Sequence, residues 1–388
     1  MTREGAGAES PVGGAGVQPS DVTTIRRSPE VLVLGGGIVG LCCAHVLSER
    51  GHRVEVLEAL RPGSGATGAA AGMISPLVES DFDHTFARTC RTARDLWPAW
   101  AEWLAGESSV DLSFSTDGTL VPAYTTAGLQ HLDRLQETAE RLAENWERLD
   151  PDQVRELVPE LRDGALAALL LPNEFSVDPA AVVEALRRIL LRSGVLIHAR
   201  RRVVSLRARQ NGVDVEGEGW SASCDHVVIA TGAGSGAIEG VGNLPIRGVR
   251  GQMISFGGFA AHKGPNLRAG GHYALRRGSE LLVGATVEKS ADDDAVTEAG
   301  RDELRDFALE LFPGLQWKAV SRHWAGVRPA APDELPVIGP LHSPRVVIAT
   351  GHYRNGILLG PWTARVVADL IAHGRSTELP EEFSPNRF

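Results

Sequence analysis

A glycine-rich segment near residue 35 carries the strongest chemical signal in the chain. Gly35, Gly37 and Gly40 follow the apolar run 31–34 in G-x-G-x-x-G spacing, and a helical pattern and a second apolar strand lead to Glu58. Glycines so spaced allow a tight turn, close approach of the backbone to a pyrophosphate, and a helix lying close to the sheet. The helix N-terminus attracts phosphate groups. The segment predicts a dinucleotide site, and an acidic strand end that can bind ribose hydroxyls favours FAD or NAD over NADP.

A second segment rich in small residues follows directly. Residues 61–76 read RPGSGATGAAAGMISP, so few side chains stand between the backbone and a neighbour. Beside a nucleotide fold, such a stretch favours a segment that wraps a flat cofactor. We expect a helix to begin near Ala69.

Composition and charge exclude several classes of protein. The 388-residue chain has a net charge of −10, which disfavours nucleic acid as a partner, and no apolar run is long enough to span a bilayer. Its four cysteines form no C-x-x-C pair, so neither a metal site nor a redox dithiol is indicated, and a reducing cytoplasm is expected. Residues 1–29 lack the apolar centre of a secretory signal and predict a disordered tail.

The pattern of the remaining chain predicts a mixture of helices and strands that returns to the first sheet after an excursion. Segment 226–236 is a buried strand that runs into glycines, and 345–374 closes the chain with a strand, a glycine turn and a helix. Between them, alternation predicts an antiparallel sheet. The expected helices are 84–105, 127–148, 175–195 and 297–311; the expected strands include a pair within 110–124 and segments 203–206, 213–215, 252–256, 271–275 and 281–287.

Five motifs together resemble a known family. They are VLVLGGGIVG (31–40), ATGAAAGM (66–73), VVIATGAGSG (227–236), WAGVRP (324–329) and GHYRNGILLGP (351–361). In this order they resemble the D-amino-acid oxidase superfamily of flavoenzymes, and within it the glycine oxidases of thiamine biosynthesis. The last motif is the most specific of the five.

The resemblance implies an α/β (α+β) fold of two domains, in which a Rossmann-like FAD-binding domain is interleaved with an antiparallel-sheet substrate domain. We expect the FAD-binding domain to comprise 30–83, 151–247 and 331–388, and the substrate-binding domain 84–150 and 248–330. FAD is expected to be non-covalent, because no cysteine follows Cys224.

The resemblance also assigns residues to the substrate site. Oxidation of an α-amino acid requires an anchored carboxylate and a neutral amine, and the planar fork of an arginine matches two carboxylate oxygens. Arg328 in WAGVRP aligns with the family's carboxylate-binding arginine, and Arg354 in GHYRNG with a second arginine near the substrate. The alternative for Arg328 is a structural salt bridge, and the alternative for Arg354 is that it orders the loop at the edge of the flavin. The expected FAD contacts are Gly35, Gly37, Ile38, Val39, Gly40, Glu58, Ala66, Thr67, Ala70, Ala71, Gly72, Met73, Val204, Thr231, Gly232, His352, Tyr353, Arg354, Asn355, Gly356, Ile357 and Leu358.

One position departs from the family pattern. Alignment from the motif GAT (284–286) places His272 where glycine oxidases usually have a tyrosine that touches the substrate carboxylate, and Tyr273 follows it. Neighbouring residues on a strand face opposite ways, so only one of them can face the substrate. We expect His272 to line the site, which would broaden specificity beyond glycine.

The implied activity is FAD-dependent oxidation of glycine and small amines, such as sarcosine and small D-amino acids, to an imine and then glyoxylate. O2 would be reduced to H2O2, and the imine would feed thiazole formation. Two alternatives are a D-amino or imino acid dehydrogenase and a specialised-metabolism oxidase with a larger amine substrate; a flavoprotein without activity is a third. Relatives suggest a homotetramer, and no membrane or nucleic-acid partner is expected.

Overall fold

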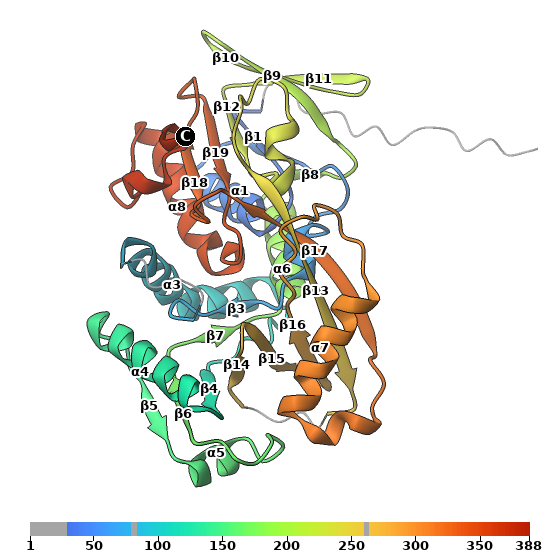
Figure 1. Ribbon diagram of the computed structural model, residues 1–388. Helices are drawn as coiled ribbons and strands as arrows, with labels where there is room; N and C mark the ends of the chain where they lie inside the picture. The colour runs from blue at the N-terminus through green and yellow to red at the C-terminus, as the bar shows by residue number, and fades with distance from the viewer. Residues whose placement is uncertain (1–28, 79–83, 260–263) are drawn as a thin grey trace, which may run out of the picture.

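The protein is described by a computed structural model over residues 29–78, 84–259 and 264–388. The expected N-terminal tail therefore lies outside the described residues, apart from residue 29. Two large sheets form an α/β structure, with helices packed on both (Figure 1). None of the helices in the described ranges is both long and apolar enough to cross a membrane.

The first sheet is the nucleotide-binding type predicted from the glycine motif. Five of its six strands run parallel, and the sixth, an antiparallel strand, forms one edge. Strand β1 (Val31–Leu34) before the glycine turn is a continuous apolar run, because helices and a small three-stranded sheet bury both of its faces. Its neighbour β2 (Val54–Leu57) is interrupted only by Glu55, which is buried and lies 2.7 Å from His198 Nε2. The spatial order is β18 (Val337–Pro340), β19 (Val346–Thr350), β12 (His226–Ile229), β1 (Val31–Leu34), β2 (Val54–Leu57) and β8 (Leu196–His198).

Layers of helices and of strands cover the two faces of this sheet. The helical layer contains α1 (Ile38–Glu49), α3 (His84–Ser108), α6 (Pro179–Arg192) and α8 (Gly356–His373). The opposite face is covered by a three-stranded antiparallel sheet of β9 (Val203–Arg209), β10 (Gly212–Gly217) and β11 (Trp220–Cys224). Helices α1 and α8 pack on each other. Most of their residues are apolar and buried, so the two helices form the centre of the core between this sheet and its helical layer.

The second sheet has eight strands and is antiparallel except where β14 runs parallel to β4. Its outer face is covered by α7 (Glu298–Leu311), with Thr297 as the N-cap. Two further helices, α4 (Thr126–Arg141) and α5 (Pro151–Leu157), cover its far end (Figure 1). The spatial order is β17 (Arg322–Ala330), β13 (Arg247–Gly257), β16 (Glu280–Gly284), β15 (His272–Arg277), β14 (Asn266–Ala269), β4 (Thr119–Ala123), β6 (Ala167–Leu171) and β5 (Glu147–Leu149).

Short elements connect the two sheets, and three of them differ from the sequence-based expectations. The helix expected to begin near Ala69 instead ends there, as α2 (Ala66–Ala69), and β3 (Met73–Ile74) follows and pairs with β7 (Phe175–Ser176). Segment 110–124 holds one strand rather than two. The helix expected over 127–148 ends at residue 141, since the chain there turns to add β5 to the sheet edge.

The expected domain bounds also differ from the arrangement of the elements. Helix α3, expected in the substrate-binding domain, packs on α6 and α8, and the Trp97 Nε1 donates a hydrogen bond to the Leu358 carbonyl at 3.0 Å. Strand β6, expected in the FAD-binding domain, pairs with β4 in the eight-stranded sheet. In both cases the buried apolar residues of the element determine which of the two large sheets it belongs to.

A buried carboxyl group ties the connecting elements to the eight-stranded sheet. Glu174 is 1% exposed, and its Oε1 accepts hydrogen bonds from the backbone N–H groups of Leu77 (3.1 Å) and Val78 (3.4 Å). The hydroxyls of Ser75 and Thr119 adjoin the same carboxyl. Burial raises the pKa of Glu174 to about 7, in spite of these donors.

This raised pKa predicts a pH-dependent stability. Between the ordinary carboxyl pKa and about 7 the folded state holds a proton that the unfolded state has lost, so stability should fall as pH rises through this window and then level off. We expect wild type to lose up to about 3 kcal/mol between pH 4.5 and 8 relative to Glu174→Gln, which cannot ionise. Urea unfolding of both proteins at several pH values measures the difference; parallel pH profiles would contradict it.

Candidate active site

A cavity of about 510 Å³ lies where the two large sheets meet. On one side it is bounded by the turns that follow the parallel strands β1, β2, β12 and β19, at the edge where α/β sheets bind their ligands. On the other side it is bounded by one face of β13, β15 and β17. Most residues expected to bind cofactor or substrate line it: Gly35, Gly37, Ile38, Val39, Glu58, Ala66, Thr67, Ala70, Ala71, Gly72, Met73, Thr231, Gly232, Tyr273, Arg328, His352, Tyr353, Arg354, Gly356 and Ile357.

The glycine turn has the geometry that its spacing predicted. Gly35 has a φ of +104°, and a Cβ there would lie 2.4 Å from the Ala230 carbonyl oxygen. A Cβ on Gly40 would lie 2.0 Å from the Gly35 oxygen, so Gly40 lets α1 lie against the turn without itself lining the cavity. The N-terminus of α1 therefore borders the cavity, as a phosphate site requires, and the Thr67 hydroxyl accepts a hydrogen bond from its Ile38 N–H at 3.1 Å.

Glu58 stands directly after β2 and lines the cavity, as its place at the strand end predicted. Its Oε2 accepts a hydrogen bond from the Gly36 N–H at 2.7 Å, and its Oε1 accepts one from the Leu60 N–H at 2.7 Å. Both bonds aim the carboxylate at the turn. Each oxygen can accept a second hydrogen bond, so the group can still bind ribose hydroxyls.

The small-residue segment is clamped between the two sheets. Trp324 Nε1 on β17 donates to the Ala69 carbonyl at 3.1 Å, and a Cβ on Gly326 would lie 2.4 Å from the Ala69 Cβ. From β15, Arg277 Nη2 donates to the carbonyls of Ala71 and Val177. The segment therefore forms a wall of backbone and methyl groups that a flat ring system can contact.

The C-terminal motif closes the cavity between β19 and α8. The Tyr353 N–H donates to the Pro329 carbonyl at 2.9 Å, which joins the motif to β17, and Tyr353 has a φ of +49°. His352 Nε2 lies 3.0 Å from the Thr363 hydroxyl. Burial lowers the pKa of His352 to about 4, so this ring is neutral at physiological pH. Two residues of the motif, Asn355 and Leu358, are buried and do not line the cavity, although both were expected to contact FAD.

Arg328 projects from β17 into the cavity, as the resemblance implied. Its Nη1 donates to the backbone carbonyls of Thr286 (3.1 Å) and Arg250 (3.4 Å). The guanidinium lies over Gly251, where a Cβ would be 2.2 Å from Nη1. A fixed guanidinium at a cavity wall is suited to bind a carboxylate.

The expectation for His272 was wrong, because alternation along β15 turns it away from the cavity. His272 faces α7, with Nε2 3.3 Å from the Glu303 carboxylate and its ring 5.0 Å from that of Phe307. Tyr273 faces the cavity instead, and its hydroxyl donates to the Met253 sulfur at 3.6 Å. A tyrosine therefore lines the cavity from β15, one residue later than the position that the alignment pointed to.

Other differences concern one expected FAD contact and several lining residues that were not named as contacts. Val204, expected to contact FAD, is 44% exposed and does not line the cavity, whereas Arg202, two residues earlier and just before β9, does line it. Two sequence signals pointed to further lining residues: the glycines at 63 and 65, and the alternation around Met253. The lining residues outside the segments singled out in the sequence include Ala59, Leu60, Arg202, Gly251, Met253, Asp292, Asp293 and Asp294; Gly63, Ser64, Gly65, Ala233 and Gly234 line the cavity within segments that were singled out.

A nucleotide-binding sheet and an arginine-bearing sheet that enclose one cavity define a dinucleotide-dependent oxidoreductase. The chain belongs to the family of FAD-dependent oxidoreductases, whose model matches residues 30–370. It is an enzyme of this family, and its cofactor is FAD.

Several relatives share nearly the full length of the chain. A glycine oxidase of Bacillus licheniformis is 30% identical over 94% of this chain and 98% of its own length, and one of Pseudomonas aeruginosa is 31% identical over 92% and 99%. The bifunctional protein ThiO/ThiG of Trichormus variabilis is 31% identical over 92% of this chain, which spans only 55% of that protein. The crystal structure of glycine oxidase from Geobacillus kaustophilus superposes with a TM-score of 0.88 at 28% identity, over 93% of this chain and 99% of that one.

The residues present fit FAD. The glycine turn leaves the N-terminus of α1 open to a pyrophosphate, Glu58 can bind a ribose, and the clamped segment 66–73 offers a wall for a flat ring. All four cysteines are buried on α1, α3 and β11, away from the cavity lining, which agrees with non-covalent binding.

The position of Glu58 generates a prediction about cofactor retention. Glu58→Ala should weaken FAD binding by about 10- to 100-fold, since charged hydrogen bonds to the ribose and to the turn are lost. Titration of apoprotein with FAD measures this. Glu58→Gln, which keeps one acceptor oxygen, should fall between Ala and wild type; full FAD retention by the alanine variant on a desalting column would contradict the role.

The orientation of β15 generates a second prediction. Tyr273→Phe should weaken binding of a small carboxylate ligand by about 2- to 10-fold, because one neutral hydroxyl donor is removed from the cavity. His272→Gln should leave that affinity unchanged, because its side chain faces α7. Titrating the oxidised flavin spectrum with acetate compares the two; a larger effect at His272 would refute this assignment.

Proposed function

We propose that this enzyme oxidises the amine of small α-amino acids, with glycine and sarcosine as the preferred substrates. The single observation that carries the proposal is Arg328, a guanidinium fixed at the cavity wall opposite the clamped segment. The names of the relatives support glycine, and a solved iminodiacetate oxidase from Chelativorans sp. BNC1 (26% identity, TM-score 0.83) supports small N-substituted relatives of glycine.

The chain's own residues would supply position and electrostatics. Arg328 holds the substrate carboxylate in a bidentate pair, and the Tyr273 hydroxyl adds a donor on the same face. Arg354 also lines the cavity. Its positive charge disfavours protonation of the substrate amine, and so favours the neutral amine that can be oxidised. FAD, held at the glycine turn and Glu58, would supply the two-electron redox chemistry of the oxidation, with O2 as the proposed final acceptor and H2O2 as its product.

The product would be an imine, which hydrolyses to glyoxylate or enters thiazole formation. The bifunctional ThiO/ThiG relatives favour a role in thiamine biosynthesis. We further infer action in the cytoplasm, with a homotetramer as the proposed assembly. An oxidase for a larger amine is the second candidate, favoured by the acidic residues Asp292–Asp294 in the cavity lining, which attract an additional cationic group.

Anaerobic reduction of the bound flavin tests the function. Glycine and sarcosine should bleach the oxidised flavin spectrum, and admission of air should restore it quickly. Bleaching only by bulkier amines would favour the second candidate, and slow recovery in air would indicate a dehydrogenase. Absence of bleaching by every amine would refute amine oxidation.

Replacement of the anchor gives the corresponding mutational prediction. Arg328→Ala should raise KM for glycine at least about 30-fold, since loss of one partner of a buried charge pair costs about 2–5 kcal/mol. FAD should stay bound, which the flavin absorbance measures. Arg328→Lys, which keeps the charge and loses the fork, should recover only part of the affinity; an unchanged KM in both variants would remove Arg328 from the site.

A further inference from the structure

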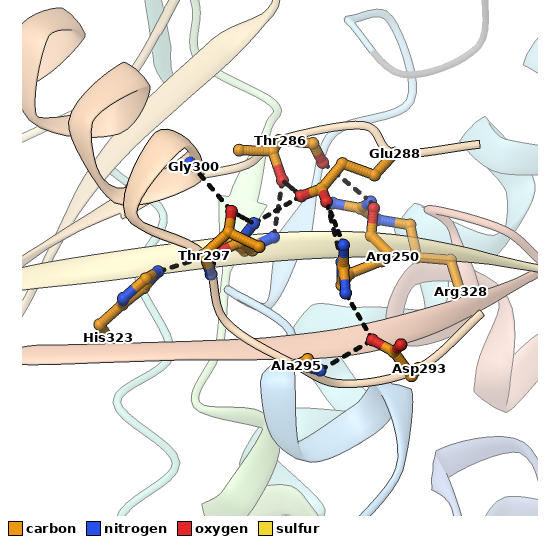
Figure 2. A network of polar contacts seen from close by, with 10 residues as sticks. Arg250, Thr286, Glu288, Asp293, Ala295, Thr297, Gly300, His323 and Arg328 are labelled. Atoms are coloured by element: carbon orange, nitrogen blue, oxygen red, sulfur yellow. Dashed lines mark hydrogen bonds and ion pairs between the residues drawn. The ribbon is translucent and has the colours of Figure 1, made fainter. Parts of the chain in front are cut away.

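A polar network lies behind Arg328, on the face of β13 turned away from the cavity. We call it the β13 network; Figure 2 shows how its side chains converge between β13, β17 and the loop before α7. Its members are Arg250, Gln252, Thr286, Glu288, Asp293, Thr297 and His323. None of these residues was singled out by the sequence.

Glu288 is the centre of this network. Its Oε1 accepts hydrogen bonds from Gln252 Nε2 (2.7 Å) and from the Thr286 hydroxyl (2.7 Å), and its Oε2 accepts from Arg250 Nε (2.8 Å). Burial acts to raise the pKa of Glu288, but these three donors outweigh it and hold that pKa below its ordinary value. The carboxylate is therefore charged, and both of its oxygens are engaged by donors.

Gln252 is fully buried and holds the carboxylate from one side. Its Nε2 donates to Glu288 and to the Thr297 hydroxyl, while its Oε1 accepts from the Thr297 N–H (2.8 Å). The backbone donor determines which way the amide points. His323 Nε2 lies 2.9 Å from the same Oε1, so this ring nitrogen must carry its proton.

The network reaches Arg328 through two backbone carbonyls. The Arg250 carbonyl accepts from the Glu288 N–H (3.0 Å) and from Arg328 Nη1 (3.4 Å). The Thr286 carbonyl accepts from the same Nη1, and the Thr286 hydroxyl is held by Glu288. Both oxygens that hold the guanidinium thus belong to residues that Glu288 contacts directly.

A second branch of the network reaches the cavity wall. Arg250 pairs with Asp293 through Nη1, and its N–H donates to the Ala291 carbonyl at 3.0 Å. Asp293 lines the cavity, as Arg328 does. One carboxylate therefore supports two charged groups of the cavity, although it does not itself line the cavity.

We propose that Glu288 is a positioning residue for the carboxylate anchor: by holding Arg250 and Thr286 in place, it fixes the guanidinium of Arg328 where a substrate carboxylate binds. This inference rests on the proposed function for the identity of the ligand. It predicts that loss of the Glu288 charge weakens carboxylate binding while the flavin stays bound.

The test compares Glu288→Gln with a matched control in the same sheet. Glu280→Gln makes the same change at a carboxylate that contacts Ser255 and Arg322, remote from Arg328. In Glu288→Gln an NH2 group replaces an oxygen that accepts from donors, so the array cannot be satisfied. We expect acetate, titrated against the oxidised flavin spectrum of the holoenzyme, to bind about 10- to 100-fold more weakly in Glu288→Gln and as in wild type in Glu280→Gln.

Kinetics and a direct perturbation separate positioning from general damage. KM for glycine should rise in parallel with the acetate constant, with kcat within a few-fold of wild type and FAD affinity unchanged. Gly251→Ala, which places a methyl group at the Arg328 guanidinium, should give the same pattern. The exchange Gln252→Glu with Glu288→Gln restores one charge with satisfiable donors and acceptors, so it should recover part of the acetate affinity.

Each outcome decides the inference. Unchanged acetate affinity in Glu288→Gln overturns it, as does a proportionate loss of acetate affinity, kcat, FAD affinity and melting temperature, which would mark a purely structural residue. If no amino acid reduces the wild-type flavin, the proposed function fails, but acetate binding that is lost in Arg328→Ala still tests Glu288. If acetate does not bind wild type at all, both proposals are overturned.

Discussion

The backbone of residues 66–73 has to lie between the two large sheets, and this constraint determines the geometry of the cavity. The contact is possible because the residues that meet are small: Gly326 faces Ala69, and Gly72 passes the Val177 carbonyl, where a Cβ would lie 1.9 Å away. Trp324 and Arg277 then bind the carbonyls of the segment from the substrate side. The separation between the glycine turn and the arginine-bearing strand is therefore set by backbone contact, which side-chain rotamers alter little.

The same constraint makes the two sheets one functional unit. The glycine turn is part of the β1–α1 connection, and Arg328 is part of the eight-stranded sheet, yet both line one cavity. Both the glycine turn and the Arg328 guanidinium are held by backbone contacts behind them. The turn is supported by Gly40 packing on Gly35, and the guanidinium by backbone carbonyls that the β13 network holds.

The sequence predicted well which residues line the cavity on the side of the six-stranded sheet, because its signal there is local. The glycines, Glu58 and the segment 66–73 lie within about one strand–helix–strand unit, and their spacing alone places them together. The substrate half was predicted less well. Whether His272 or Tyr273 faces the cavity depends on the register of β15 against β16, where Tyr273 pairs with Gly284, and a one-residue slip reverses the two faces. Gly251 and Glu288 carry no local signal, because their importance comes from a side chain about 40 to 80 residues away in the chain.

The order of strands in the six-stranded sheet has a consequence for biogenesis. Strand β1 lies between β2 and β12, and β19, from residues 346–350, must join β12 before the sheet is complete. Helix α8 then covers α1, whose N-terminus borders the cavity. During synthesis, β1 leaves the ribosome about 300 residues before β19, so its edge beside β12 is enclosed only after most of the intervening chain has been made. Such non-local closure folds slowly, so the cavity, which the turns after β1 and β19 bound together, is complete only after β19 has joined the sheet.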